Sequence, residues 1–457
     1  MLRKLFILIV LVASVAAQSA GAQSKKTKSV KAPASSTHST SAAAASNETI
    51  AIKGGKLLTI THGVIENGVL VMHNGRITAV GGAGTAIPAG AKLIDATGMT
   101  VYPGLIDSET HLGLTEISAE RMTNDEIELS DEIMPHMHVY DAFHAETTLI
   151  PVTRLNGITN AIVAPASGDT LPGQDSFIQL AGASATEMLT VRDIAMPLNF
   201  TGAQRRNQSF EQAKFPFTRM GMATQLRQAF IDALDYDQKI AAYDKKKSSS
   251  DAKEKDKAGN PPKRDLKLEA LLPYLRGKKP VVLAAEQPND LLTALELANE
   301  FHLKVILNHV THAASLLDKI AATGFPVIIG PIYEQPKDSE RYDAVYSMPA
   351  QLAKRGVKIA FASYDSHQAR NLPYAAGYAV GFGLPPDEAL KAMTINPAQM
   401  WGVDKDLGSL EVGKMGNVVV ANGDPLDVKT DVKHVFIQGQ EIPLVSKQTE
   451  LRDQYWK

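Results

Sequence analysis

The strongest constraint on the fold is a repeated pattern in the middle of the chain, where short apolar runs alternate with helix-like segments. The runs are Val281–Ala285, Lys304–Asn308, Pro326–Gly330 and Lys358–Ala362. The segments that follow them are Asp290–Phe301, Ala313–Thr323, Tyr342–Gly356 and Pro386–Ala392. Continuous apolar runs are typical of strands covered on both faces, and their alternation with helices predicts a parallel sheet.

Three further runs, Val101–Ile106, Ile158–Val163 and Leu189–Ala195, bring the candidate strands close to the eight of a (β/α)8 TIM-like barrel. An open, doubly wound sheet is the alternative, since the spacing of the runs does not separate the two folds. The chain has 457 residues, 44% of them hydrophobic, which is enough for a large core and a second domain.

Short β-type runs flank this region on both sides. Before it they are Thr49–Lys53, Lys56–Ile60, Gly68–His73, Arg76–Val80 and Lys92–Asp95. Asn67-Gly68 and Asn74-Gly75 lie between runs and predict hairpins. After it, Asn417–Ala421 and Val432–Gln438 are again short strands. We therefore predict a small β-sandwich domain built from residues 48–100 and 408–445, with the barrel between them at residues 101–407.

The N-terminus predicts export. Met1–Lys4 is positively charged, Leu5–Ala17 is apolar but short for a bilayer span, and small residues follow. These features predict a signal peptide over residues 1–22, with a membrane anchor as the alternative, and then a disordered linker over residues 23–47. The chain has no cysteine, hence no lipid-bearing one, so we expect a periplasmic or secreted protein without disulfides.

Charge excludes some partners. The net charge is −2, which gives no reason to expect nucleic-acid binding, or membrane binding after signal cleavage. A Lys-rich insertion at about 244–267 holds nine Lys or Arg against five Asp or Glu, and is interpreted as a solvated surface segment. We expect a small-molecule substrate, and a homo-oligomer is possible.

The polar residues with the clearest chemistry follow the first barrel run. Asp107, Glu109 and His111 alternate with other residues, and alternation along a strand places them on one face. They would stand at the carboxyl end of a barrel strand, where active sites of such barrels are built.

This stretch, P-G-L-I-D-S-E-T-H at 103–111, resembles the first-strand signature of the amidohydrolase superfamily, P-G-x-I-D-x-H-x-H, in its exported, imidazolonepropionase-like branch. Further strings resemble the same family in order: Ala362–Ser366, Leu372–Gly377, Ala389–Ala398 and Gly408–Lys414. The chain departs from the signature at Glu109, where the family has the first of two metal-binding histidines.

The resemblance implies a metal-dependent hydrolase that cleaves a non-peptide carbon–nitrogen bond. The expected substrate is a small cyclic amide. It implies the ligands Glu109, His111, His309 and Asp365 around one divalent metal, zinc before manganese. Asp365 would also transfer the proton in catalysis, and a helix cap or loop aspartate is its alternative role. Ala284 stands where the family has a fifth-strand histidine, so a binuclear centre is not expected.

Three residues are candidate substrate contacts. His312 follows His309 by three positions and is the alternative inward-facing histidine; Glu286 follows Ala284 by two. Arg219 is predicted either to pair with a substrate carboxylate or to brace its loop. The competing hypothesis, motivated by Glu109 and Ala284, is a catalytically degenerate barrel retained as a binding or scaffold protein.

Overall fold

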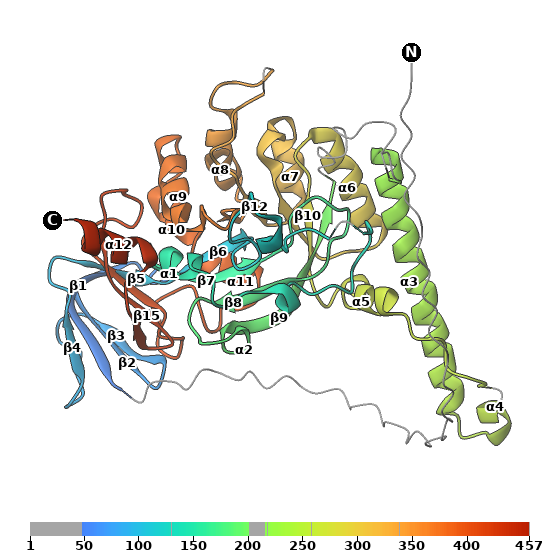
Figure 1. Cartoon of the computed structure of the whole chain (residues 1–457), viewed down its shortest axis with the longest axis horizontal. Coiled ribbons are helices and arrows are strands. Elements are labelled where there is room, and N and C mark those ends of the chain that lie inside the picture. Colours follow the sequence, from blue (N-terminus) through green and yellow to red (C-terminus); the bar gives the residue numbers. More distant parts are fainter. Residues whose placement is uncertain are drawn as a thin grey trace, which may run out of the picture. The chain divides into compact units, whose positions relative to one another are not determined.

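The computed structural model describes residues 48–128, 130–200, 215–216, 218–256, 258–337 and 339–456. The predicted signal peptide and linker lie outside them. The first sheet in this part of the chain forms the barrel, with strands in the order β13-β12-β11-β10-β9-β8-β7-β6 (Figure 1). Their bounds are β6 Leu105–Thr110, β7 Ile158–Val163, β8 Asp175–Gln179, β9 Leu189–Asn199, β10 Val281–Ala284, β11 Val305–Asn308, β12 Val327–Ile329 and β13 Ile359–Phe361.

The barrel closes between its first and last strands. The Tyr364 amide donates to the carbonyl oxygen of Glu109 at 3.0 Å, and Thr110 Oγ1 donates to the carbonyl oxygen of Asp365 at 2.9 Å. These bonds rule out the open sheet. The barrel is not wholly parallel, because β8 pairs antiparallel with both β7 and β9. The alternating pattern did not predict β8, which follows β7 through a loop instead of a helix.

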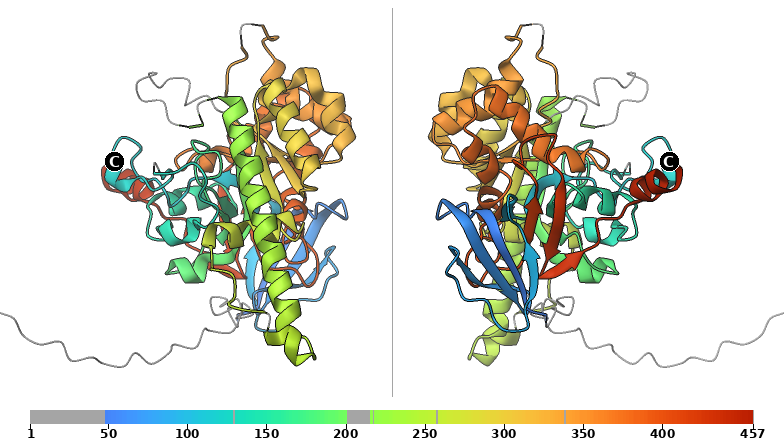
Figure 2. Two further views of the ribbon diagram at one scale, coloured as in Figure 1. Left: turned by 90° about the vertical axis from the view of Figure 1, so that its right-hand side faces the viewer. Right: turned by 90° about the vertical axis from the view of Figure 1, so that its left-hand side faces the viewer.

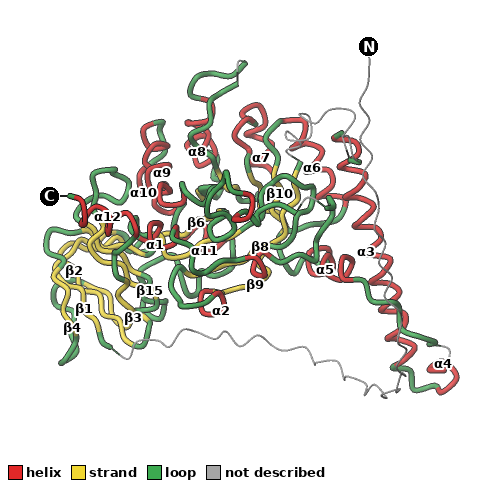
Figure 3. The backbone as a smooth tube through the Cα atoms, viewed as in Figure 1, coloured by secondary structure: helices red, strands yellow, loops and turns green. Residues whose placement is uncertain are grey.

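Most helices lie around the strands of the barrel, as Figure 3 shows, whereas α4 and α12 lie away from them. Their bounds are α1 Leu149–Arg154, α2 Ala185–Met188, α3 Arg219–Lys247, α4 Ala252–Asp256, α5 Leu266–Leu275, α6 Pro288–Glu300, α7 Leu317–Thr323, α8 Ala344–Lys354, α9 Leu372–Gly381, α10 Pro386–Lys391, α11 Ile395–Met400 and α12 Lys447–Tyr455. Short 3-10 helices are η1 Arg121–Thr123, η2 Val139–Ala142, η5 Val310–His312, η6 Ala314–Leu316 and η7 Ala369–Asn371.

The barrel interior is packed with side chains that alternate along the strands. Ile106, Val282, Ile306 and Ile328 meet there, and Trp401, just after α11, packs against the same cluster. Their complete burial makes the lower half of the barrel a solid core, as expected for this fold. The polar side chains of the candidate active site lie toward the carboxyl ends of the strands.

The predicted strand Val101–Ile106 is two strands, and this corrects the sequence interpretation. β5 (Thr100–Pro103) belongs to the second sheet, whereas β6 starts at Leu105. Gly104 lies between the two strands. A Cβ at this position would overlap the side chain of Thr159, which is buried in β7. The chain thus passes from one domain to the other at a position that only glycine fits.

The second sheet forms the small β-sandwich domain, in the order β16-β15-β14-β5-β1-β2-β3 with β4 beside β1. The remaining bounds are β1 Ile50–Leu58, β2 Val64–His73, β3 Arg76–Gly81, β4 Lys92–Asp95, β14 Val418–Ala421, β15 Val432–Ile437 and β16 Gln440–Ile442. β14 pairs antiparallel with β5, which joins the two ends of the sequence in one sheet. Figure 2 shows these red and blue strands side by side.

One of the two predicted hairpins is present. Asn74 and Gly75 both have positive φ, 49° and 77°, and connect β2 to β3. The prediction of a hairpin at Asn67-Gly68 is wrong, since β2 continues through both residues. A Cβ at Gly68 would overlap the Leu57 side chain of β1, so this glycine is required by close strand packing.

The predicted insertion at 244–267 starts inside a long helix. α3 runs from Arg219 to Lys247, and its first half is anchored by buried residues such as Leu226 and Phe230. The second half carries no buried residue after Tyr236. The Lys-rich end of α3 is consequently exposed, in agreement with a solvated surface segment (Figure 2).

Candidate active site

A chain of hydrogen bonds crosses the carboxyl end of the barrel. Asn308, the last residue of β11, donates from Nδ2 to Glu109 Oε2 on β6 at 2.6 Å. The Tyr364 hydroxyl, from the loop after β13, donates to Asn308 Oδ1. Because the amide oxygen of Asn308 accepts from Tyr364, its NH2 group must face Glu109. Three strands thereby fix the position of one buried carboxyl group.

Asp107 links β6 to the residue that follows β13. Its carboxylate accepts from the Ser363 amide at 3.0 Å and from Ser363 Oγ at 2.6 Å. Burial raises the pKa of Asp107 to about 7, although these hydrogen bonds oppose the rise. Asp107 thus helps to close the barrel directly beneath Glu109.

Glu109 lies among other carboxyl groups. Burial, with the negative charge of Asp107 adding to it, raises the pKa of Glu109 to about 8 against the bond from Asn308. Burial and then Glu109 raise the pKa of Asp175, on β8, well above its usual value. Among the described residues none of the three carboxyl groups has a salt-bridge partner, and Asp175 Oδ1 accepts no hydrogen bond. Proton uptake is one way in which this cluster lowers its charge.

Two histidines belong to the same end of the barrel. His111 Nδ1 lies 2.9 Å from the Ala164 carbonyl oxygen, which only accepts, so Nδ1 carries a proton and donates it in this bond. His309 is 9% exposed, and its ring centroid lies 4.3 Å from that of Tyr364. Burial, then the nearby His111, lower the pKa of His309 to about 4, so its imidazole is neutral at pH 7.

The backbone is strained where these rings meet. His309 and Tyr364 have φ values of 59° and 54°, in the left-handed region that non-glycine residues rarely adopt. Such conformations cost free energy and concentrate at functional sites. Both turns aim their rings at each other across the strand ends, which marks this place as a candidate active site.

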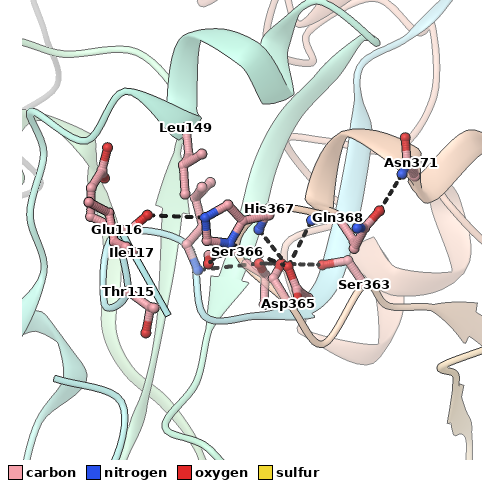
Figure 4. A network of polar contacts seen from close by, with 12 residues as sticks. Thr115, Glu116, Ile117, Leu149, Ser363, Asp365, Ser366, His367, Gln368 and Asn371 are labelled. Atoms are coloured by element: carbon pink, nitrogen blue, oxygen red, sulfur yellow. Dashed lines mark hydrogen bonds and ion pairs between the residues drawn. The ribbon is translucent and has the colours of Figure 1, made fainter. Parts of the chain in front are cut away.

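Asp365 does not face this cluster. Its Oδ1 accepts from the backbone amides of His367 and Gln368 at 2.6 and 2.8 Å, and 48% of its side chain is exposed (Figure 4). His367 Nε2 in turn lies 3.0 Å from the Glu116 carbonyl oxygen, which joins this loop to the one after β6. Two amides of its own turn thus donate to Oδ1 of Asp365, as in the loop-capping alternative, whereas its part in catalysis stays a prediction.

The predicted ligands do not form a metal centre as they stand. In the described part of the chain no group of three or more His, Asp or Glu side chains is arranged to hold a metal ion. Glu109, His111 and His309 offer suitable donor atoms but do not converge, and Asp365 is turned away. Ala284 pairs in register with Asn308 at the end of β10, so the fifth-strand position supplies an apolar methyl group where a ligand would be needed.

The candidate substrate contacts are separate from this cluster. His312, with 5% of its side chain exposed, lies between Glu340 Oε2 at 2.8 Å from Nδ1 and Glu334 Oε2 at 3.5 Å from Nε2. Glu286 has its pKa raised by burial and by Glu334, and its Oε2 lies 4.0 Å from Lys337 Nζ. His312 and Glu286 are thus in one group of charges on the loops after β10, β11 and β12.

Arg219 braces two helices. It is the first residue of α3, and its guanidinium pairs with Asp290 in α6, whose carboxylate is only 1% exposed. This ion pair agrees with the bracing alternative predicted for Arg219, whereas pairing with a substrate carboxylate stays a prediction. A buried carboxylate requires a counter-charge, and the arginine supplies it.

Sequence reasoning missed three members of the cluster: Asn308, Tyr364 and Asp175. Asn308 ends a predicted run and Tyr364 lies two residues beyond another, and a polar residue at the end of an apolar strand is the signal that would have marked them. Asp175 carried no such signal, because its strand runs opposite to its neighbours and was not predicted.

A barrel of this kind, with polar residues at the carboxyl ends of its strands and a β-sandwich built from both termini, is the architecture of an amidohydrolase. Residues 295–442 match the model of the Amidohydrolase family. The chain has the fold of the amidohydrolase superfamily and resembles its imidazolonepropionase-like members.

Individual relatives agree with this assignment. Imidazolonepropionase from Symbiobacterium thermophilum is 26% identical over 412 residues, 82% of this chain and 90% of that protein. Amidohydrolase tasK from Hapsidospora irregularis is 26% identical over 394 residues, and the chain spans 39% of its length. The crystal structure of an amidohydrolase from Thermotoga maritima has a TM-score of 0.78 at 27% identity, covering 86% of this chain and 99% of that one.

Proposed function

We propose that this protein hydrolyses a carbon–nitrogen bond of a small, cyclic amide substrate at the carboxyl ends of β6, β11 and β13. The observation that carries the proposal is the buried Glu109 carboxyl group, held by Asn308 and Tyr364 at the end of the barrel where such enzymes bind substrates. The similarity to an imidazolonepropionase, which spans most of both chains, supports the class of reaction.

Amide hydrolysis needs a group that delivers a proton to the leaving nitrogen and a group that takes one from water. Glu109 suits the first task, since a buried carboxyl group that holds its proton near neutral pH can donate it. His309 is the candidate for the second, with an imidazole that is neutral at pH 7 and, at a pKa of about 4, a weak base. Asp365, the residue predicted to transfer the proton, is already bound by two backbone amides.

One divalent ion, zinc before manganese, stays a prediction from the sequence. Its ligands would be Glu109, His111 and His309, which would have to move together, because the described residues hold no such group as they stand. An ion bound by Glu109 and His309 would occupy the same atoms and hold Glu109 ionised, so it would exclude the proton transfers proposed for these two residues.

The test compares Glu109→Gln with Asp365→Asn on a panel of cyclic amides and dipeptides. Gln keeps the hydrogen bond from Asn308 but has no acidic proton, so we expect kcat/KM to fall at least about 100-fold. Asn can still cap the turn at 365, so that variant should lose less than about tenfold. Full activity in Glu109→Gln would refute the assignment.

A second function is favoured by the missing ligands: a barrel that binds a small molecule without turning it over. Ala284 at the end of β10 and the capped Asp365 are the observations behind it. This alternative predicts no turnover of any amide in the panel and no change in melting temperature with zinc or manganese. A metal centre would stabilise the fold by about 2.7 kcal/mol at a hundred times Kd, so a clear metal-dependent rise contradicts it.

We also propose export to the periplasm. The proposal rests on the composition of residues 1–22. In the part of the chain that the structure describes, no helix is both long and apolar enough to cross a membrane. Cell fractionation with N-terminal sequencing of the recovered protein tests it, and a chain that retains residues 1–22 would refute it.

A further inference from the structure

A pocket of about 530 Å³ lies where α9 and the start of α10 meet the loop between β14 and β15. Tyr374 and Tyr378 of α9 line it, as does Tyr333 from the loop after β12. Among the described lining residues the charged ones are Asp424 and Asp427, both in the loop between β14 and β15, and the others are apolar or glycine. These five residues take no part in the proposed hydrolysis, so the pocket is a candidate site for a separate ligand.

The tyrosine rings are held in place by their neighbours. The ring centroids of Tyr333 and Tyr378 lie 5.9 Å apart, with 52° between the ring planes. Tyr378 also packs edge-on against Tyr346, at 5.3 Å and 84°. Asn156 Nδ2 donates to the Tyr374 hydroxyl at 3.2 Å. Although Tyr333 and Tyr378 are 53% and 42% exposed, their contacts order the rings before any ligand binds, which lowers the entropic cost of binding.

The two aspartates are also fixed, but each keeps one free carboxylate oxygen. Oδ1 of Asp424 accepts from the Leu426 amide, and Oδ1 of Asp427 accepts from the Lys429 amide, both at 2.9 Å. The Asp427 amide donates to the Asp424 carbonyl oxygen at 3.0 Å, which joins the two residues in one turn. In the part of the chain that the structure describes, Oδ2 of each accepts no hydrogen bond and neither carboxylate has an ion-pair partner. The pocket wall thus carries two negative charges that no neighbouring cation offsets.

These features favour one class of ligand. The face of an aromatic ring carries partial negative charge and attracts a cation within about 6 Å of the ring centroid. Carboxylates attract the same charge, and the apolar lining suits alkyl groups. A metal ion is a poorer match, because in the described residues no group of three His, Asp or Glu side chains is arranged to hold one.

We propose that this pocket binds a small organic cation, such as a quaternary ammonium group. The rings of Tyr333, Tyr374 and Tyr378 contact its alkyl groups, and Asp424 and Asp427 supply the counter-charge. The site is independent of the proposed hydrolysis, because it shares no residue with the carboxyl cluster at the end of the barrel.

The experiment compares two probes of nearly the same shape by titration calorimetry: choline and 3,3-dimethylbutan-1-ol, in which an uncharged carbon replaces the nitrogen. Cation–π contacts and exposed carboxylates each contribute modestly, and together they should make the full chain bind choline about tenfold more tightly than the alcohol. Tyr333→Leu and Asp427→Asn should each weaken choline binding by about threefold or more and change binding of the alcohol by less than about twofold.

Each variant has a matched control. Tyr342→Leu changes a tyrosine of the same loop that is 76% exposed and lies outside the pocket lining. Asp251→Asn changes an exposed aspartate that, like Asp427, accepts from the amide two residues later at 2.9 Å, but just before α4. Both controls should bind choline as the wild-type protein does.

Equal affinity for choline and the alcohol in the wild-type protein would overturn the proposal, as would unchanged choline binding in both Tyr333→Leu and Asp427→Asn. Phosphatidylcholine vesicles present the same group, so co-sedimentation of the protein with them would assign the site to a lipid headgroup. Choline binding without co-sedimentation would assign it to a free solute. None of these outcomes depends on turnover of an amide.

Discussion

Replacing Glu109 by Gln should change how the stability of the fold depends on pH. The pKa of Glu109 rises from 4.5 to about 8 in the fold, chiefly through burial. An acid whose pKa is raised by folding holds its proton in the folded state while the unfolded chain loses it, so stability is greatest below pH 4.5 and falls until about pH 8. At about 1.4 kcal/mol per pH unit, the loss from pH 4.5 to pH 7 is about 3 kcal/mol.

Gln is close in shape to a protonated Glu and still accepts the bond from Asn308 Nδ2. It does not ionise, so the variant lacks this share of the pH dependence. The free energy of unfolding of Glu109→Gln minus that of wild type should therefore increase by about 3 kcal/mol between pH 4.5 and pH 7, so the variant becomes the relatively more stable protein as the pH rises. Any constant cost of burying the amide cancels in this difference.

The assay is urea unfolding followed by circular dichroism at several pH values, on protein dialysed against EDTA. EDTA is necessary because a bound cation would favour the ionised carboxylate. Glu296→Gln, at an exposed position on α6, is the matched control for losing a surface carboxylate. Parallel curves for Glu109→Gln and wild type would refute the reasoning, since they would mean that Glu109 ionises as it does in the unfolded chain.

Two other changes test the internal contacts. Arg219→Ala should destabilise the fold by about 2 kcal/mol, because it leaves the carboxylate of Asp290 buried without its counter-charge; urea unfolding measures this, and adding Asp290→Asn should recover part of the loss. Gly104→Ala should cost about 2 kcal/mol through overlap with Thr159, and Thr159→Ala should relieve part of it; a variant of wild-type stability would contradict the close packing.

The barrel could be predicted from the sequence because strands that are buried on both faces are continuously apolar. Runs such as Val281–Ala285 are continuously apolar, and the helices between them keep their own period. No comparable signal marks the strand order between β7 and β9, where a loop takes the place of the usual helix. β8 is reached by a loop from β7 and runs antiparallel, so neither its direction nor Asp175 followed from the alternating pattern.

The site was harder to predict, because the spacing of residues fixes which strand end they occupy but not which atoms they meet. Glu109 was found from its strand position. The turn that satisfies the carboxylate of Asp365 depends on the path of the chain through His367 and Gln368, which no motif encodes. In the same way, Arg219 was equally suited to a substrate or to Asp290, and only the packing of α3 against α6 decides between them.

The exchange of histidine for glutamate at position 109 changes what the site needs. An imidazole there would be neutral, whereas Glu109 adds a carboxyl group beside Asp107 and near Asp175. The buried cluster can lower its charge with a cation or with protons. In the described part of the chain the ligands do not converge, and the pKa of about 8 for Glu109 favours its protonated form at neutral pH. A carboxyl group that holds a proton at neutral pH can donate it to a leaving nitrogen. The residue that departs from the family signature is thus the one whose chemistry this structure supports best.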